Sequence, residues 1–384
     1  MTGIAVALGG HLVSEAEANR GARFDRNDFH KALDAVLDRY VEPVDGSALL
    51  ARGLKHMVAG LDAHSHFLTA AERKALRALA KDGMAGLTIH LHTAPGGEDR
   101  TLEVVGVLPG SAAEHAGLTL GDQVLEIGGH DVARMLSQIE AEALLMGKVG
   151  DTVALRVQRK HAPHPEALTL TLAEAPRELM ASELIPAKTG TGDERVVGCI
   201  QLRVFRHGVG EAFKKELARL RRSAGAAGLA GLIIDLRGNP GGEVDEALVV
   251  ADLFVDSGIL TRTRGRGGRI LREEIAHEAG TETDLPIVVL QDRHTASAAE
   301  LLTAALRDHG RAKSLGERSY GKGTVQEIMG MRDGSVLKLT IARYFSPKDG
   351  KIDGVGLTPD VELPASRRGE TVAQALGLFG LSPR

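Results

Sequence analysis

The sequence of 384 residues is short of several residue types, and each shortage excludes a class of protein. Its single cysteine, Cys199, cannot form a disulfide within the chain, and the apolar residues around it predict a buried thiol. There is no tryptophan and only 3% aromatic residues, so the core must be largely aliphatic. No run of 18 or more apolar residues occurs, and no membrane-spanning helix is therefore expected. The net charge of −4 gives no basic surface of the kind that binds nucleic acid.

The first 82 residues suggest a helical region behind an ambiguous start. Residues 1–26 begin with a mildly apolar stretch, Met1 to Val13, but lack the basic segment of a secretory signal. We expect them to be a remnant of a signal or anchor, or to be disordered. Residues 27–82 are predicted to be helical, because apolar residues recur at helical spacing from Phe29 to Tyr40 until Pro43 ends the run, and a second such pattern follows.

Residues 83–175 have the pattern of a small β-rich domain. Strand-like runs at 88–91, 102–107 and 123–127 are separated by turns rich in glycine. Residues 176–194 are expected to link this domain to a larger one.

Residues 195–384 alternate strand-like and helix-like segments, which predicts a layered α/β domain. The buried strand predicted at 232–236 is followed by Gly241-Gly242, and the strand at 286–290 leads directly to Ser297. The charged stretch 262–282 is expected to be an exposed loop.

Ser297 and Lys322 have the residue types of a nucleophile and a base. Ser297 opens an apolar helical stretch, so backbone N–H groups and the positive end of the helix dipole lie beside its hydroxyl. Lys322 stands between two glycines, where the backbone can pass close to another segment. A serine needs a neighbour that takes its proton, and an amine can do so only if burial lowers its pKa. These residues alone would equally suit a helix cap and a surface lysine.

Five motifs in one order favour the catalytic interpretation. They are Leu61-Asp62-Ala63-His64-Ser65-His66-Phe67, Asp235-Leu236-Arg237-Gly238-Asn239-Pro240-Gly241-Gly242, Thr295-Ala296-Ser297-Ala298-Ala299-Glu300, Tyr320-Gly321-Lys322-Gly323-Thr324-Val325-Gln326 and Gly356-Leu357-Thr358-Pro359-Asp360. With them the chain resembles the carboxyl-terminal processing peptidases, or tail-specific proteases, from about residue 27 to about residue 362. The chain departs from that family in having Asp292-Arg293-His294, in place of small residues, before the serine motif.

The resemblance implies a fold with an N-terminal helical segment, an inserted PDZ domain with a β-sandwich or barrel-like sheet, and an α/β-layered serine protease core at 195–384. It implies that Ser297 is the nucleophile, Lys322 the base and Gln326 the residue that orients the lysine. The backbone N–H groups of Gly242 and Ala298 would form the oxyanion hole, with no metal or other cofactor.

The PDZ domain would bind an apolar, unstructured C-terminal tail of a protein substrate by adding it to a sheet edge. The loop expected to hold the tail's carboxylate is Met84-Ala85-Gly86-Leu87, with Leu87 and Ile89 beside an apolar pocket. The resemblance further implies that the PDZ domain gates the active site and that an adaptor or activator protein and a homo-oligomer are to be expected. It also implies export to the periplasm or cell envelope, while the ambiguous start leaves a cytosolic location as the alternative.

Four other interpretations compete with this one. Asp62, His64 and Ser65 include the residue types of a hydrolytic triad, but triads are assembled from distant positions, so a hydrogen-bonded turn is expected there. His294 is an alternative base for Ser297. The stretch 316–322 matches Gly-x-x-x-x-Gly-Lys of a phosphate-binding loop, but the next residue, Gly323, cannot hold magnesium. A catalytically inactive PDZ scaffold is the fourth possibility.

Overall fold

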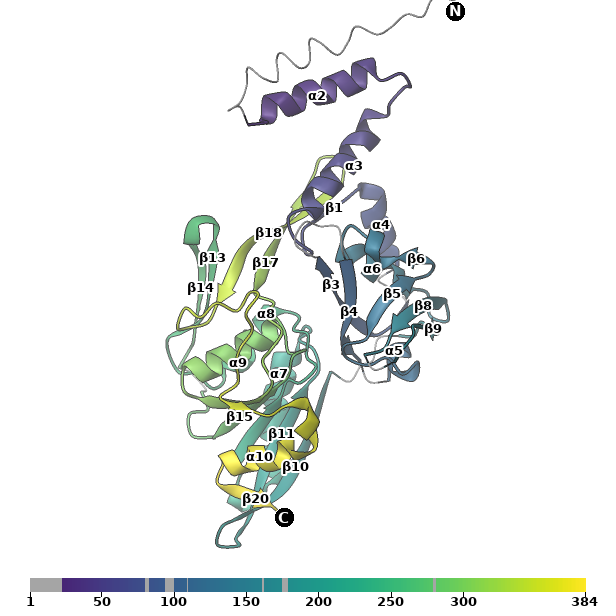
Figure 1. Cartoon of the computed structure of the whole chain (residues 1–384). Coiled ribbons are helices and arrows are strands. Elements are labelled where there is room, and N and C mark those ends of the chain that lie inside the picture. Colours follow the sequence, from purple (N-terminus) through teal and green to yellow (C-terminus); the bar gives the residue numbers. More distant parts are fainter. Residues whose placement is uncertain are drawn as a thin grey trace, which may run out of the picture. The chain divides into compact units, whose positions relative to one another are not determined.

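The computed structural model describes residues 23–79, 83–93, 100–108, 110–160, 162–174, 179–278 and 281–384 (Figure 1). The chain divides into two compact units, Met1–Leu54 and Lys55–Arg384. Most of the expected signal or anchor segment, 1–26, lies outside the described residues. Within the described part of the chain, no helix has both the length and the apolar character needed to cross a membrane.

Both helices predicted near the N-terminus are confirmed, as α2 (Arg26–Arg39) and α3 (Gly46–Ala59). α2 begins with a capping box: the Asp25 carboxylate accepts hydrogen bonds from the backbone N–H groups of Asn27 and Asp28, and the Asp28 carboxylate accepts one from the Asp25 N–H. No residue of α2 is buried.

The β-rich domain is built on one antiparallel sheet with an aliphatic core. Its strands, in order across the sheet, are β3 (Leu87–Thr93), β4 (Arg100–Val107), β5 (Gln123–Ile127), β8 (Thr152–Gln158) and β9 (Glu166–Thr171), and β6 (His130–Asp131) pairs with β5. The remaining elements are β2 (Gly83–Met84), β7 (Met146–Gly147), α5 (Ala112–His115) and α6 (Gln138–Leu144). β3 is an edge strand of this sheet, so one of its sides pairs with no other strand, and its Leu91 N–H donates to Gln138 Oε1 of α6 at 3.4 Å.

The larger domain contains a seven-stranded sheet. Its order is β19 (Val361–Glu362), β16 (Ala312–Gly316), β15 (Ile287–Gln291), β12 (Gly231–Asp235), β11 (Glu194–Leu202), β10 (Met180–Thr189) and β20 (Leu381–Pro383). The five strands from β19 to β11 are parallel to their neighbours, as the predicted α/β alternation requires.

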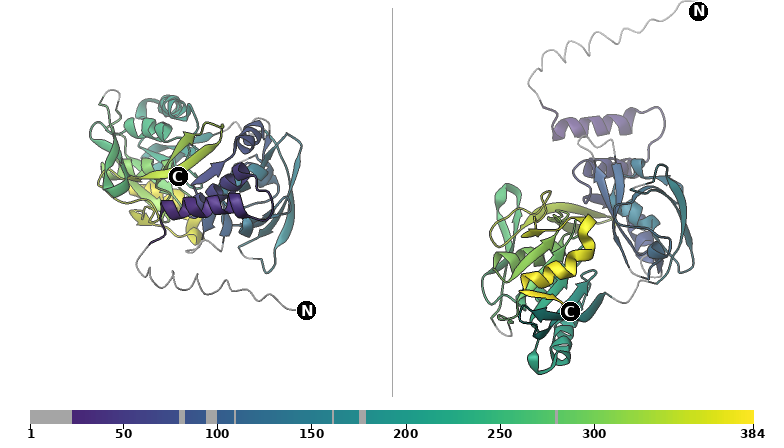
Figure 2. Two further views of the ribbon diagram at one scale, coloured as in Figure 1. Left: turned by 90° about the horizontal axis from the view of Figure 1, so that it is seen from above. Right: turned by 60° about the horizontal axis from the view of Figure 1, so that its bottom comes forward.

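Helices cover both faces of this sheet, so its strands are apolar on both sides. Ile234 and Val289 pack in the cluster with α7 (Val209–Ser223), α8 (Val244–Asp252) and α9 (Ala298–Asp308). Their neighbours Ile233 and Val288 point to the other face, where α10 (Thr371–Leu378) packs. Figure 2 shows α10 in yellow, beside the C-terminal strand.

A second sheet joins distant parts of the sequence. β18 (Val336–Phe345) pairs with β1 (His66–Leu68), β13 (Ile259–Gly265) and β17 (Thr324–Gly330), and β14 (Ile270–Ile275) pairs with β13; α4 (Ala70–Leu79) follows β1. β1, which begins within the first of the five motifs, is therefore tied to the larger domain by backbone pairing with β18, and His66 lies opposite Lys338.

Three expectations need correction. The stretch 262–282 is mostly a β-hairpin of β13 and β14, because its charges pair across the strands, as Arg262 does with Glu273 (2.7 Å). The expected linker at 176–194 contains β10, which pairs along its length with β11 and belongs to the core. Cys199 is only partly buried, although burial raises its pKa to about 12.

Candidate active site

The candidate catalytic residues lie on three loops that meet because of strand order. β12, β15 and β16 are adjacent parallel strands, so their carboxyl ends lie at the same edge of the sheet. The loop after β12 carries Gly241 and Gly242, the loop after β15 carries Ser297, and the loop after β16 carries Lys322. Residues separated by 81 positions, from Gly241 to Lys322, are thereby brought to one site.

The first two loops are locked together by backbone contacts. Asn239 accepts a hydrogen bond from the Ala296 N–H at 2.9 Å, and its side chain accepts one from the Gly241 N–H at 2.8 Å. Gly241 has φ 98°, and a Cβ there would lie 2.7 Å from the Cβ of Ser297 and 2.9 Å from the Ala298 nitrogen. Only glycine permits this approach to Ser297.

Ser297 has a strained backbone at the start of α9. Its φ is 54° and its ψ is −120°, a conformation that L residues with a side chain rarely adopt. Strain of this kind persists only where the surroundings enforce it, and it is concentrated at functional sites.

The oxyanion-hole candidates are two N–H groups beside this serine. Ala298 is the first residue of α9, where backbone N–H groups have no partner within the helix. Gly242 has φ 131° and forms a bridge with Phe205, whose backbone oxygen accepts from Glu243. In the described part of the chain, neither the Gly242 N–H nor the Ala298 N–H donates a hydrogen bond, so both are available to a ligand.

A buried carboxylate that the sequence analysis gave no role connects the serine loop to the lysine loop. Glu300 Oε2 accepts hydrogen bonds from the backbone N–H groups of Ser297 (2.8 Å) and Lys322 (2.9 Å). Its Oε1 accepts from the Ser319 hydroxyl (2.5 Å) and the Gly321 N–H (2.7 Å). Burial raises the pKa of Glu300, and these four donors act in the opposite direction. In the sequence, Glu300 could have been recognised from the spacing Ser297-x-x-Glu300, which is that of a capping box.

Lys322 has the electrostatic setting that a neutral amine needs. Burial lowers its pKa below that of an ordinary lysine, and nearby Lys338 acts in the same direction, while Glu142 and Glu300 oppose it. Among the described residues, the Lys322 amine makes no hydrogen bond or ion pair. A larger share of this lysine is therefore neutral at a given pH than of an exposed lysine.

Gln326 follows on β17, and its amide is held by two threonines. Its Nε2 donates to Thr324 Oγ1 at 2.8 Å and to Thr340 Oγ1 at 3.3 Å. The strand itself argues against the phosphate-binding loop, because such a loop runs into a helix whereas Thr324–Gly330 is extended.

The two histidine alternatives occupy different settings. His294 is buried, and its Nε2 accepts a hydrogen bond from Arg293 Nε at 2.8 Å. The segment from Asp62 to Ser65 forms the expected hydrogen-bonded turn: Asp62 accepts from the N–H of His64 (2.8 Å) and from the N–H and hydroxyl of Ser65 (2.7 and 2.9 Å).

The loop predicted to bind a tail's carboxylate leads into the edge strand β3. Gly86 has φ 69°, and a Cβ there would lie 2.1 Å from the Cβ of Ser111, so the tight loop requires glycine. Ala85 and Ile89 are buried in the domain's core, and Leu87 packs against that core. Met84 pairs with Met146 of β7.

One group of described residues has the spacing of metal ligands, namely His207, Glu243 and Glu246. Both carboxylate oxygens of Glu246 accept backbone hydrogen bonds, from Gly208 (2.8 Å) and Gly210 (2.7 Å) at the start of α7. These hydrogen bonds give Glu246 a structural role, that of capping the start of α7.

The fold and these loops define a hydrolase whose serine lies at the start of a helix, and comparison with known proteins gives the class. The model of peptidase family S41 matches residues 196–363, and that of the PDZ domain matches 103–159. A carboxyl-terminal-processing protease of Picosynechococcus sp. is 32% identical over 79% of this chain and 70% of that protein. The carboxy-terminal processing protease CtpA of Bacillus subtilis is 30% identical over 92% of this chain and 72% of that protein.

Solved structures agree with these relatives. The photosystem II D1 C-terminal processing protease aligns with a TM-score of 0.76 and 28% identity, over 92% of each chain. The chain belongs to peptidase family S41, with the carboxyl-terminal processing proteases, and it is a serine-type peptidase with a PDZ domain.

Proposed function

We propose that this peptidase is an endopeptidase with a serine–lysine mechanism, in which Ser297 is the nucleophile and Lys322 the general base. The observation that carries the proposal is the shared carboxylate of Glu300, which holds the backbones of Ser297 and Lys322 through one oxygen atom. The lowered pKa of Lys322 supports it, because a base must be neutral to accept the proton.

In the first step, Ser297 Oγ attacks the carbonyl carbon of the scissile bond while neutral Lys322 takes the hydroxyl proton. The negative charge that develops on the carbonyl oxygen is stabilised by the N–H groups of Gly242 and Ala298. The lysine then gives its proton to the leaving amine, and an acyl-enzyme ester remains. Water, deprotonated by the same lysine, hydrolyses this ester and restores Ser297.

We further propose that the PDZ domain selects substrates by an apolar C-terminal tail that adds to the edge of β3. Two features support this: the positive φ of Gly86 in the loop before β3, and the unpaired side of that strand. The His90 ring of β3 lies 4.7 Å from the ring of Tyr320, two residues before Lys322. A tail on β3 would therefore bind to a strand that itself contacts the lysine loop. We propose that tail binding gates the site through this contact.

The mechanism is tested with the full chain and an unfolded polypeptide that ends in small apolar residues. Wild type is compared with Ser297→Ala and Lys322→Ala, without ATP or added metal, and the products are identified by mass spectrometry. Both variants should lose cleavage, while Lys313→Ala, a change on an exposed side chain of β16, should not. Cleavage that survives Lys322→Ala would assign the base to another group, with His294 the first to test.

The choice of substrate is tested separately. Amidating the substrate's C-terminus, or replacing its last residues by aspartate, should raise KM without changing the cleaved bond. An unchanged KM would exclude tail recognition. An adaptor protein, self-association and a site of action outside the cytoplasm stay predictions of the family resemblance, and chloroplastic relatives are consistent with the last.

A further inference from the structure

The loop that leads from β15 to Ser297 makes a direct contact with the PDZ domain. Arg293 in this loop donates through Nη2 to the backbone oxygen of Leu120 at 3.4 Å. Leu120 belongs to the PDZ domain, where it lies between α5 and β5. Arg293 is part of the segment 292–294, in which this chain departs from its family by having no small residues. A long side chain at this point therefore reaches another domain.

Gly121 leaves the room that this side chain fills. Its φ is 88°, and a Cβ there would overlap Arg293 Nη2 and lie 3.3 Å from Arg293 Cζ. The same Cβ would lie 3.7 Å from Glu103 Oε1, so a carboxylate of opposite charge lies on the PDZ side of the contact. A side chain at position 121 would displace the guanidinium, and glycine is the residue that allows the contact.

Arg293 lies in a turn that is fixed to both loops of the oxyanion hole. The Thr295 N–H donates to the Asp292 backbone oxygen at 3.0 Å, and the Asp292 N–H donates to Thr295 Oγ1 at 2.9 Å. The Asp292 carboxylate accepts from the N–H groups of His294 and Gly238, each at 3.0 Å. Since Gly238 belongs to the glycine loop, a displacement of Arg293 would disturb the serine loop and the glycine loop together.

The same guanidinium also engages His294, the alternative base. Arg293 Nε donates to His294 Nε2 at 2.8 Å. A guanidinium only donates, so this ring nitrogen accepts, and the proton of the neutral ring is on Nδ1. Neutral His294 then has no lone pair to offer the Ser297 hydroxyl while Arg293 is in place.

We propose that Arg293 is a positioning residue: its contact with the PDZ domain at Gly121 holds the turn that places Ser297 for acylation. The PDZ domain then touches both catalytic loops, because the ring of His90 in β3 lies 4.7 Å from the ring of Tyr320 in the lysine loop. This inference rests on the proposed function of Ser297 as the nucleophile. It gives the charged segment before the serine motif a role in the geometry of the site.

The test measures how fast Ser297 reacts with a small fluorophosphonate, which forms a bond to the serine oxygen and loses fluoride. In the full chain, Arg293→Ala should slow this labelling about tenfold, because the serine is displaced. With an unfolded polypeptide substrate, kcat should fall equally and KM should change little. Arg293→Lys should recover part of the rate, since a lysine can reach Leu120 but lacks the fork that also holds His294. Arg222→Ala, at an exposed arginine in the last turn of α7, should behave as wild type.

A second experiment tests the contact itself. Gly121→Ala puts a methyl group where the guanidinium lies, and it should slow the labelling about as much as Arg293→Ala does. In the double variant this methyl group has no side chain to displace, so the two losses should not add. Gly117→Ala is the matched control in the same domain, because it also has a positive φ (71°) but its nearest contact, Arg159 Nη2, lies at 3.9 Å. It should be labelled at the wild-type rate.

Urea unfolding of each variant separates a displaced serine from a less stable protein, and the labelling is carried out where every variant is folded. Should Gly121→Ala fail to fold, the comparison of Arg293→Ala with Arg293→Lys still decides. Wild-type or faster labelling in Arg293→Ala, or additive losses in the double variant, would overturn the inference. A wild type that is not labelled at Ser297 would contradict the proposed nucleophile and the inference with it. Cleavage retained in Lys322→Ala would contradict only the proposed base.

Discussion

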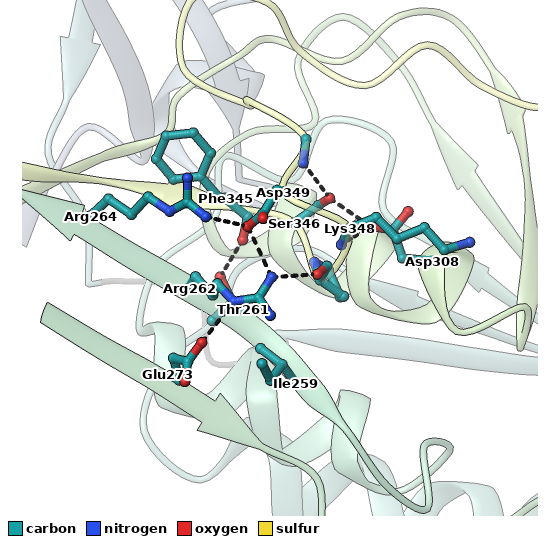
Figure 3. Close-up of polar contacts among 12 residues, drawn as sticks. Ile259, Thr261, Arg262, Arg264, Glu273, Asp308, Phe345, Ser346, Lys348 and Asp349 are labelled. Atoms are coloured by element: carbon teal, nitrogen blue, oxygen red, sulfur yellow. Dashed lines mark hydrogen bonds and ion pairs between the residues drawn. The ribbon is translucent and has the colours of Figure 1, made fainter. Parts of the chain in front are cut away.

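Two carboxylates in this protease each hold a loop in place, one buried between the loops of Ser297 and Lys322 and one at the surface. Glu300 is 0% exposed and accepts four hydrogen bonds, all from uncharged donors. Asp349 has a side chain that is 48% exposed, and it accepts from Arg262 (2.9 Å) and Arg264 (2.7 Å). Figure 3 shows these two arginines converging on Asp349, beside the contacts of Ser346 and Lys348 with Asp308.

The comparison teaches that burial matters more than formal charge for the strength of such a contact. Around Asp349, water competes for the same partners and salt screens the attraction, so an exposed ion pair contributes about 0–1 kcal/mol. Glu300 is fully buried, so bulk water does not reach its donors, and each buried donor left without a partner costs about 1–3 kcal/mol. The pair of sites therefore predicts very different responses to equivalent mutations.

The largest effect is expected at Glu300. Glu300→Ala leaves four buried donors without an acceptor and should lower the free energy of unfolding by about 3–5 kcal/mol, with loss of cleavage. Glu300→Gln keeps the volume but turns an NH₂ group toward N–H donors, so its loss should be intermediate. Urea unfolding and peptide cleavage measure both. If Glu300→Ala unfolded within about 1 kcal/mol of wild type, the ranking by burial would be wrong.

The next effect is expected where the glycine loop touches Ser297, the proposed nucleophile. In Gly241→Ala the new Cβ would lie 2.7 Å from that of Ser297, at φ 98°. We expect about 1–3 kcal/mol of destabilisation from overpacking, and a loss of kcat of about 100-fold because Ser297 is displaced. The control is Gly267→Ala, which also has positive φ (71°) but no heavy atom within 4 Å. Equal kcat in the two variants would contradict a role for close approach.

A smaller effect is expected from two histidines, the buried His66 and the partly buried His64, as the pH is lowered. Burial lowers the pKa of His64 and of His66 from 6.5 to about 4. Between these values the unfolded chain binds more protons than the folded chain, so stability falls with decreasing pH, by on the order of 1 kcal/mol per pH unit for each histidine. Unfolding followed across this range should show a shallower slope in His66→Gln. A slope that does not depend on His66 would count against the prediction.

The smallest effect is expected at Asp349 itself. Asp349→Ala loses both arginine contacts, at a cost of about 0–1 kcal/mol that should shrink in high salt. Asp349→Gly loses the same contacts but relieves a positive φ of 64°, so it should be more stable than the alanine variant by about 1 kcal/mol. Thermal melts at low and high salt measure both. Cleavage should be unaffected, and a salt-independent loss would indicate that Asp349 is less accessible to water than its exposure implies.

Local patterns predicted most of the elements that later carry the site. The strand at 123–127 was placed by its flanking glycines, and β12 and β15 by short apolar runs, because a strand covered on both faces is apolar throughout. The hairpin of β13 and β14 was missed for the opposite reason. Its many charged residues are typical of an exposed loop. Only the structure shows that they pair across the two strands, as Arg262 does with Glu273.

By itself the sequence determined the family, the serine and lysine to examine, and the glycines beside them, because these are properties of short motifs in order. Only the tertiary structure decided that Glu300 joins the serine and lysine loops, and that the Asp62–Ser65 turn contacts β18. The Thr340 N–H and its acceptor Ser65 Oγ are 275 positions apart, and their contact exists only because β1 pairs with β18. Hydrogen-bond partners at such separation depend on strand order and register, and no local pattern encodes them.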